Sequence, residues 1–166
     1  MKRQQLVEHV RAAFPAEPIR GRAAFAQWGG TYLDARDYAR AIDGKTWEQL
    51  DLDYIVRRHD ALGFLSTCEL VQLLSVYLLS IANEGVMSPA LDSVLVELTR
   101  PARDPARFDA FVQALSAAQR DAIANTLAYI ADEDPDGSPG RAAREARGLL
   151  FESVNSRSRG VSKSER

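Results

Sequence analysis

The chain has 166 residues, of which 46% are hydrophobic and 27% are charged, a composition typical of one soluble globular domain. Its formal net charge of −2 is unevenly distributed, because residues 1–140 carry 14 basic and 20 acidic side chains whereas residues 141–166 carry 7 and 3. The single cysteine excludes an intrachain disulfide and a cysteine-rich zinc site, and two histidines are too few for most histidine-based metal or catalytic centres. The excess of acidic side chains in residues 1–140 argues against a nucleic-acid ligand. We also expect no cofactor.

The N-terminal segment predicts a helix rather than a secretion signal. Leu6, Val10 and Phe14 recur every four residues, which predicts a helix over residues 2–14. Charged residues interrupt this apolar pattern, so the segment is not a signal peptide. We therefore expect a cytoplasmic protein.

Capping residues predict short helices before residue 65. Residues 19–33 remain ambiguous, because several apolar side chains surround a Gly-Gly turn. The expected elements are a helix over 35–42 capped by Asp34, a helical turn opened by the capping box of Thr46 and Gln49, and a helix capped by Asp53 that runs to about Leu62.

The long apolar stretch from Ser66 to Glu84 is the segment around which we expect the other helices to pack. Apolar residues cover nearly its whole circumference, as in helices that are buried in a core or span a membrane. Ser66 and Glu69 predict a capping box at its start, and Gly85 supplies a cap at its end. We expect a core helix and no membrane partner, because polar residues interrupt the stretch at Glu69, Gln72, Ser75, Ser80 and Asn83.

The second half of the chain continues with helices, and no segment shows the sustained alternation that predicts a strand. The sequence therefore predicts an all-α fold, an irregular bundle of seven or eight helices around a central buried helix at about 67–84. We expect a single domain over 1–154 and a polar, basic, flexible tail over 155–166. The later helices are expected to begin at Ser88-Pro89, at Asp104-Pro105, at the Ser116/Gln119 capping box and, after a loop over 132–140, at Arg141.

Candidate partner-binding residues lie in an acidic part of the chain. Residues 34–69 carry eight acidic and five basic side chains. If the acids share a surface with aromatic residues, that surface suits a basic protein, because opposite charges speed association and aromatics anchor interfaces. The same residues would equally make a solvated face whose aspartates only cap helices. The candidate residues are Asp34, Asp37, Asp43, Trp47, Glu48, Asp51, Asp53, Tyr54 and Asp60.

Two further segments carry residues that suit a cation site or a catalytic nucleophile. Asp132, Asp134 and Asp136, followed by glycine, match the first half of a calcium loop, but the residue that should supply the last ligand is Ala143. We therefore assign no metal and expect the arginines that follow the loop to balance its charge. Cys68 would lie in the first turn of the central helix, where a pairing with His59 would suit a nucleophile. Free cysteine is more commonly a small buried apolar residue, so we prefer that interpretation and assign no catalytic residue.

Loose features recur over residues 46–131: Trp47 and Leu50, then Leu62 with Phe64-Leu65-Ser66, then an apolar helix with Tyr77-Leu78, then Leu115-Ser116, Gln119, Ile123 and Leu127 through Ile130. This pattern resembles a family of small, uncharacterised all-α bacterial proteins, some of them like the immunity proteins of polymorphic or contact-dependent toxin systems. The resemblance implies a shared fold and carries no catalytic residue.

These observations lead to a non-enzymatic protein that acts by binding another protein. The resemblance implies an immunity-type protein that neutralises a cognate bacterial toxin by covering a basic active site with its acidic surface. The sequence is also compatible with a structural or regulatory adaptor that has a different partner, and with an uncharacterised enzyme. An immunity gene should directly follow a toxin gene, which separates an immunity protein from an adaptor.

Overall fold

The computed structural model describes residues 2–19, 33–99 and 104–160, without the side chains of residues 33–35, 64 and 153–160. The fold is all-α, as predicted, and no strand occurs within these residues. Its elements are α1 (Arg3–Ala13), α3 (Leu33–Ile42), the 3-10 helix η2 (Trp47–Gln49), α4 (Leu52–Arg57), the 3-10 helices η3 (His59–Phe64) and η4 (Gly85–Met87) on either side of α5 (Thr67–Glu84), then α6 (Leu91–Leu98), α7 (Pro105–Ala114), α8 (Ala117–Glu133) and α9 (Ser138–Gly160).

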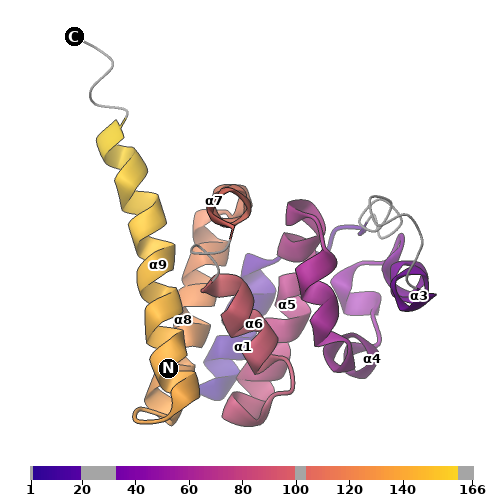
Figure 1. The fold of residues 1–166 in the computed structure, drawn as a ribbon. Helices are drawn as coiled ribbons and strands as arrows, with labels where there is room; N and C mark the ends of the chain where they lie inside the picture. The colour runs from indigo at the N-terminus through magenta and orange to yellow at the C-terminus, as the bar shows by residue number, and fades with distance from the viewer. Residues whose placement is uncertain (1, 20–32, 100–103, 161–166) are drawn as a thin grey trace.

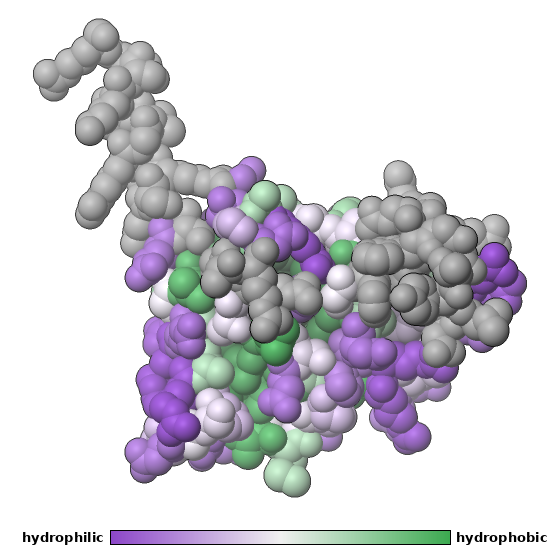
Figure 2. All heavy atoms as spheres, viewed as in Figure 1, coloured by the Kyte–Doolittle hydropathy of each residue, from purple (hydrophilic) through white to green (hydrophobic). Residues whose placement is uncertain are grey.

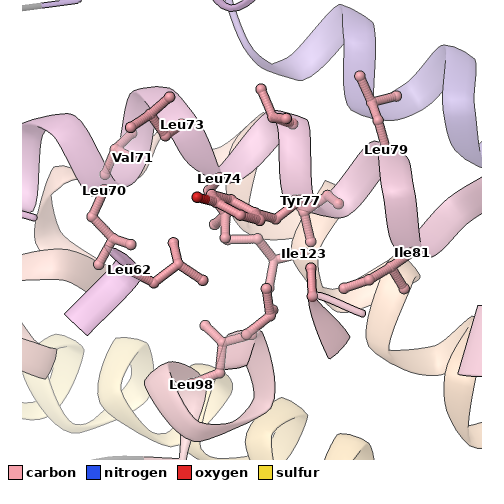
Figure 3. Close-up of a cluster of buried hydrophobic side chains, with 14 of the residues drawn as sticks. Leu62, Leu70, Val71, Leu73, Leu74, Tyr77, Leu79, Ile81, Leu98 and Ile123 are labelled. Atoms are coloured by element: carbon pink, nitrogen blue, oxygen red, sulfur yellow. The ribbon is translucent and has the colours of Figure 1, made fainter. Parts of the chain in front are cut away.

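The central helix is α5, and the prediction that it is buried is confirmed. Thirteen of its 18 residues are buried, and it packs against α1, α4, α7 and α8. Figure 3 shows its leucines and Tyr77 meeting Leu62, Leu98 and Ile123 from neighbouring elements. By length and composition α5 is able to cross a membrane, yet 67% of its most apolar window is buried inside the fold, as expected of a core helix.

Several helix boundaries follow the predicted capping residues. Asp104 accepts a hydrogen bond from the Arg107 backbone N–H at 3.0 Å, and Ser116 and Gln119 bond reciprocally at the start of α8. Thr46 and Gln49 likewise form the predicted capping box of η2. These local signals were readable because each involves atoms only three residues apart.

Other predicted features of the helix ends are wrong. Helix α5 begins after Ser66 as predicted, but the expected capping box is absent, because the Ser66 side chain caps nothing and Glu69 is buried with Oε2 unbonded. Asp51, rather than Asp53, caps α4 by accepting from the Tyr54 N–H at 3.1 Å. The expected helix over 53–62 is two helices, since the backbone leaves helical geometry at Arg58.

The early helices α3 and α4 and the last helix α9 lie on opposite sides of the molecule. In Figure 1, α9 runs along one side and extends past its neighbours, whereas α3 and α4 lie on the other. Helix α9 packs on α8 and α6, and its backbone remains helical to Gly160, six residues beyond the predicted end at 154. Most of the ambiguous segment 19–33 falls outside the described residues, but Ile19 exchanges backbone hydrogen bonds with Gly44 and Lys45 at 2.8 and 2.9 Å.

Candidate functional site

The predicted partner-binding residues belong to α3, η2, α4, η3 and the turns between them, the part of the chain that we call the acidic end, and Figure 1 shows α3 and α4 on the same side of the molecule. Figure 2 shows hydrophilic residues on this side of the molecule. Asp43 is half-buried and the Asp34 side chain lies outside the described residues. The carboxylates exposed at the acidic end are those of Asp37, Glu48, Asp51, Asp53 and Asp60.

Buried side chains of α3 and α4 attach the acidic end to the core. Tyr38 of α3 is buried and hydrogen-bonds to Tyr77 of α5, while Ile55 and Val56 of α4 pack in the core. Gly44, at the turn after α3, has a φ of +73°, a conformation that glycine adopts without strain. The exposed acidic side chains of α3 and α4 therefore lie on helices whose other sides are packed against the core.

Neighbouring arginines balance part of the negative charge. Arg40 lies 3.4 Å from Asp37, and Arg57 lies 3.9 Å from Asp53. All four side chains are mostly exposed, so each ion pair is weak and open to competition from a partner. Within the described residues, the carboxylate of Glu48 has neither a hydrogen bond nor an ion pair.

The predicted aromatic anchors do not lie free at this surface. Trp47 is 5% exposed, and its indole N–H donates to the Phe14 carbonyl oxygen at 3.0 Å, so it is a core residue and not an exposed anchor. Tyr54 is half-buried, and the guanidinium of Arg58 lies 4.9 Å from its ring centroid. A buried indole is satisfied by a backbone acceptor, a contact that spacing along the chain does not reveal.

An apolar residue that sequence reasoning missed lies at the acidic end. Leu52 is 41% exposed at the first position of α4, between the capping residue Asp51 and Asp53. An exposed leucine flanked in the chain by two aspartates offers an apolar contact next to charged groups, and protein interfaces commonly combine an apolar centre with a polar rim. Its place between two aspartates was the available sequence signal.

The structure does not bring Cys68 and His59 together. Cys68 is exposed in a cleft of about 620 Å³ beside the ends of α1 and α7 and the start of α8, and no histidine is among the described residues that line it. His59 lines a different groove of about 210 Å³, where its Nδ1 lies 2.7 Å from Ser93 Oγ. The Cys68–His59 pair considered from the sequence therefore has no geometric support, and the expected burial of Cys68 is wrong.

The acidic loop between α8 and α9 is a structural connection. Asp134 accepts from the Gly140 N–H at 3.4 Å, and a Cβ at Gly140 would lie 1.8 Å from the Asp134 carbonyl oxygen, so the loop is tightly packed. Asp132 and Asp136 are exposed. Among the described residues, no group of three or more His, Cys, Asp or Glu side chains is placed to hold a metal ion.

The arginines after this loop bind its backbone. Arg141 donates to the carbonyl oxygen of Asp136, and Arg144 donates to that of Pro135 at 2.7 Å. Positive charge therefore lies beside the carbonyl end of α8, where the helix dipole favours it.

Comparisons with protein families, with curated proteins and with solved structures give no match for this chain.

Proposed function

We propose that this protein is a non-enzymatic binding protein whose acidic end contacts a basic surface of another protein. The observation that carries the proposal is Leu52, which is 41% exposed between Asp51 and Asp53 on a helix that also places Ile55 and Val56 in the core. An apolar contact supplies affinity once it is enclosed, and surrounding charges speed association and select the partner.

The form of this activity that we propose is immunity. In it, the protein neutralises a cognate bacterial toxin in the cytoplasm by covering the toxin's basic active site with the acidic end. The resemblance over residues 46–131 supports this form, and the exposed carboxylates at the acidic end supply charge opposite to that of a nucleolytic site. Occlusion needs a rigid surface, and the contacts of α4 and of Tyr38 in α3 with α5 support such rigidity.

Purification of the tagged full chain from its native host, followed by mass spectrometry, tests this proposal. We expect recovery of the toxin encoded next to the gene, and coexpression of the chain should restore growth of cells that express the toxin domain. Leu52→Arg should abolish this protection, because it places a cation where a basic surface must dock. Met87→Arg, which adds the same charge at an 81% exposed residue of η4, is the matched control.

Protection by Leu52→Arg equal to that of the wild type would refute the acidic end as the inhibitory surface. Recovery of metabolic enzymes alone would count against immunity itself.

A further inference from the structure

The groove of about 210 Å³ between η3 and α6 is continuous with the acidic end, because Asp60 belongs to both. Its other wall is the exposed side of α6, from Asp92 to Glu97. A partner seated on the acidic end would therefore meet this groove next.

Two contacts between separate elements fix the shape of the groove. His59 Nδ1 and Ser93 Oγ lie 2.7 Å apart, joining η3 to α6. Arg107 donates to the carbonyl oxygens of Leu62 and Gly63, both at 3.1 Å. Because these contacts form before any ligand binds, a side chain that enters the groove costs less conformational entropy than it would in a groove that must first become ordered.

The lining combines apolar surface with exposed carboxylates. Val96 is 48% exposed along the groove, and Leu62 also lines it. Asp60 and Asp92 are exposed, and neither has a hydrogen bond or ion pair in the part of the chain that the structure describes. Glu97 differs from them, because its carboxylate lies 3.3 Å from the Arg107 guanidinium and its side chain is 9% exposed.

We infer that this groove receives an arginine side chain of the protein partner, an inference that rests on the proposed function. The methylene stem of arginine packs on the exposed side chain of Val96, and its guanidinium lies between Asp60 and Asp92. Arginine fits better than lysine, because its planar head carries several donors and bonds to carboxylates in bidentate fashion. A metal ion fits poorly, since the described residues hold no group of three or more suitable ligands.

A nuclear magnetic resonance titration of the isolated full chain tests the inference without the partner. The probe is Nα-acetyl-arginine amide, and the control probe is Nα-acetyl-citrulline amide, which has nearly the same shape but no charge. We expect saturable shifts of the backbone amides of residues 60–63 and 92–97 with arginine, at least several-fold larger than with citrulline. The variant Asp60→Asn/Asp92→Asn should lose these shifts.

The matched control is Asp109→Asn/Asp121→Asn, which removes the same charge from exposed residues of α7 and α8 that do not line the groove. Retained shifts in this control, together with their loss in the groove variant, support the inference. Equal shifts with citrulline, shifts spread over all exposed carboxylates, or equal losses in both variants would overturn it. The titration uses no partner, so a negative result would refute only the arginine-binding groove. The proposed function is tested separately by the effect of Leu52→Arg on protection from the toxin.

Discussion

The hydroxyl oxygens of Tyr38 and Tyr77 lie 2.8 Å apart in the core, where they join α3 to the central helix α5. Both side chains are at most 1% exposed, so this contact replaces water for two polar groups at once. It also sets the position of α3, which carries Asp37 at the acidic end. A polar contact inside the core thus contributes to the placement of the candidate binding surface.

Tyr77→Phe is expected to lower the free energy of unfolding by about 1–2 kcal/mol, because Tyr38 loses a buried hydrogen-bond partner without a change in packing. Urea denaturation of the purified chain measures this change. The control is Tyr129→Phe, which removes a hydroxyl from a half-buried tyrosine of α8. Equal stability of the two variants would show that the buried contact between Tyr38 and Tyr77 contributes no more to the free energy of unfolding than a half-buried hydroxyl does.

The same pair predicts a loss of stability in alkaline solution. Burial raises the pKa of Tyr38 and of Tyr77 well above the usual value, so both remain protonated in the folded chain when the unfolded chain ionises. The unfolded chain then binds fewer protons, and the free energy of unfolding falls above about pH 10 by about 1.4 kcal/mol per pH unit for each tyrosine. Below that pH the contribution is fully present.

Urea denaturation from about pH 9 to 11 compares the wild type with Tyr77→Phe, whose average slope over this range should be shallower by about 0.7 kcal/mol per pH unit, because an unfolded tyrosine ionises only partly at these pH values. Other alkaline groups ionise equally in both proteins and cancel in this difference. Identical slopes would contradict the assigned cause.

Gly85→Ala is expected to destabilise the fold more than Gly44→Ala. Both glycines have positive φ, +60° and +73°, so alanine strains the backbone at each by about 1–2 kcal/mol. At Gly85 a Cβ would also lie 2.0 Å from the Glu133 carboxylate, whereas none of the residues that the structure describes lies within 4 Å of a Cβ at Gly44. Glu133 accepts from the Val86 N–H at 2.9 Å, and the clash would break that bond.

Denaturation of both glycine variants should show Gly85→Ala as the less stable by at least about 1 kcal/mol. The double variant Gly85→Ala/Glu133→Ala should remove the steric part of the cost. If Gly44→Ala proves equally damaging, backbone strain alone explains both results.

Arg107→Lys is expected to lower the free energy of unfolding by about 1.5–3 kcal/mol although it keeps the charge. The Arg107 guanidinium donates to the carbonyls of Leu62, Gly63 and Leu65 and pairs with Glu97, a set of contacts that one ammonium group does not reproduce. Thermal and urea denaturation measure the change. Arg57→Lys, at a side chain that is 78% exposed, should change stability by less than about 0.5 kcal/mol, and a similar effect of both substitutions would contradict this interpretation.

The sequence predicted those parts of the fold that depend on neighbouring residues. The apolar circumference of residues 66–84 identified α5 as the core helix, and the capping residues of α7 and α8 placed their starts. Both signals arise within one or two helical turns, so they are readable without tertiary contacts.

Features that depend on tertiary contacts could not be predicted from the sequence. Trp47 looked like an exposed anchor because its acceptor, the Phe14 carbonyl, lies 33 residues earlier in the chain. The break at Arg58 divides a segment whose apolar spacing is continuous, and the Arg107 contacts that hold η3 come from α7. Leu52 became a candidate only when its exposure was known.

The most direct test of the account is the affinity of the purified chain for the partner recovered from its host, measured by isothermal titration calorimetry. The account predicts that Leu52→Arg weakens binding by at least about 10-fold, or about 1.4 kcal/mol, whereas Met87→Arg leaves the dissociation constant unchanged. Equal affinities of the wild type and both variants would contradict the acidic end as the binding surface.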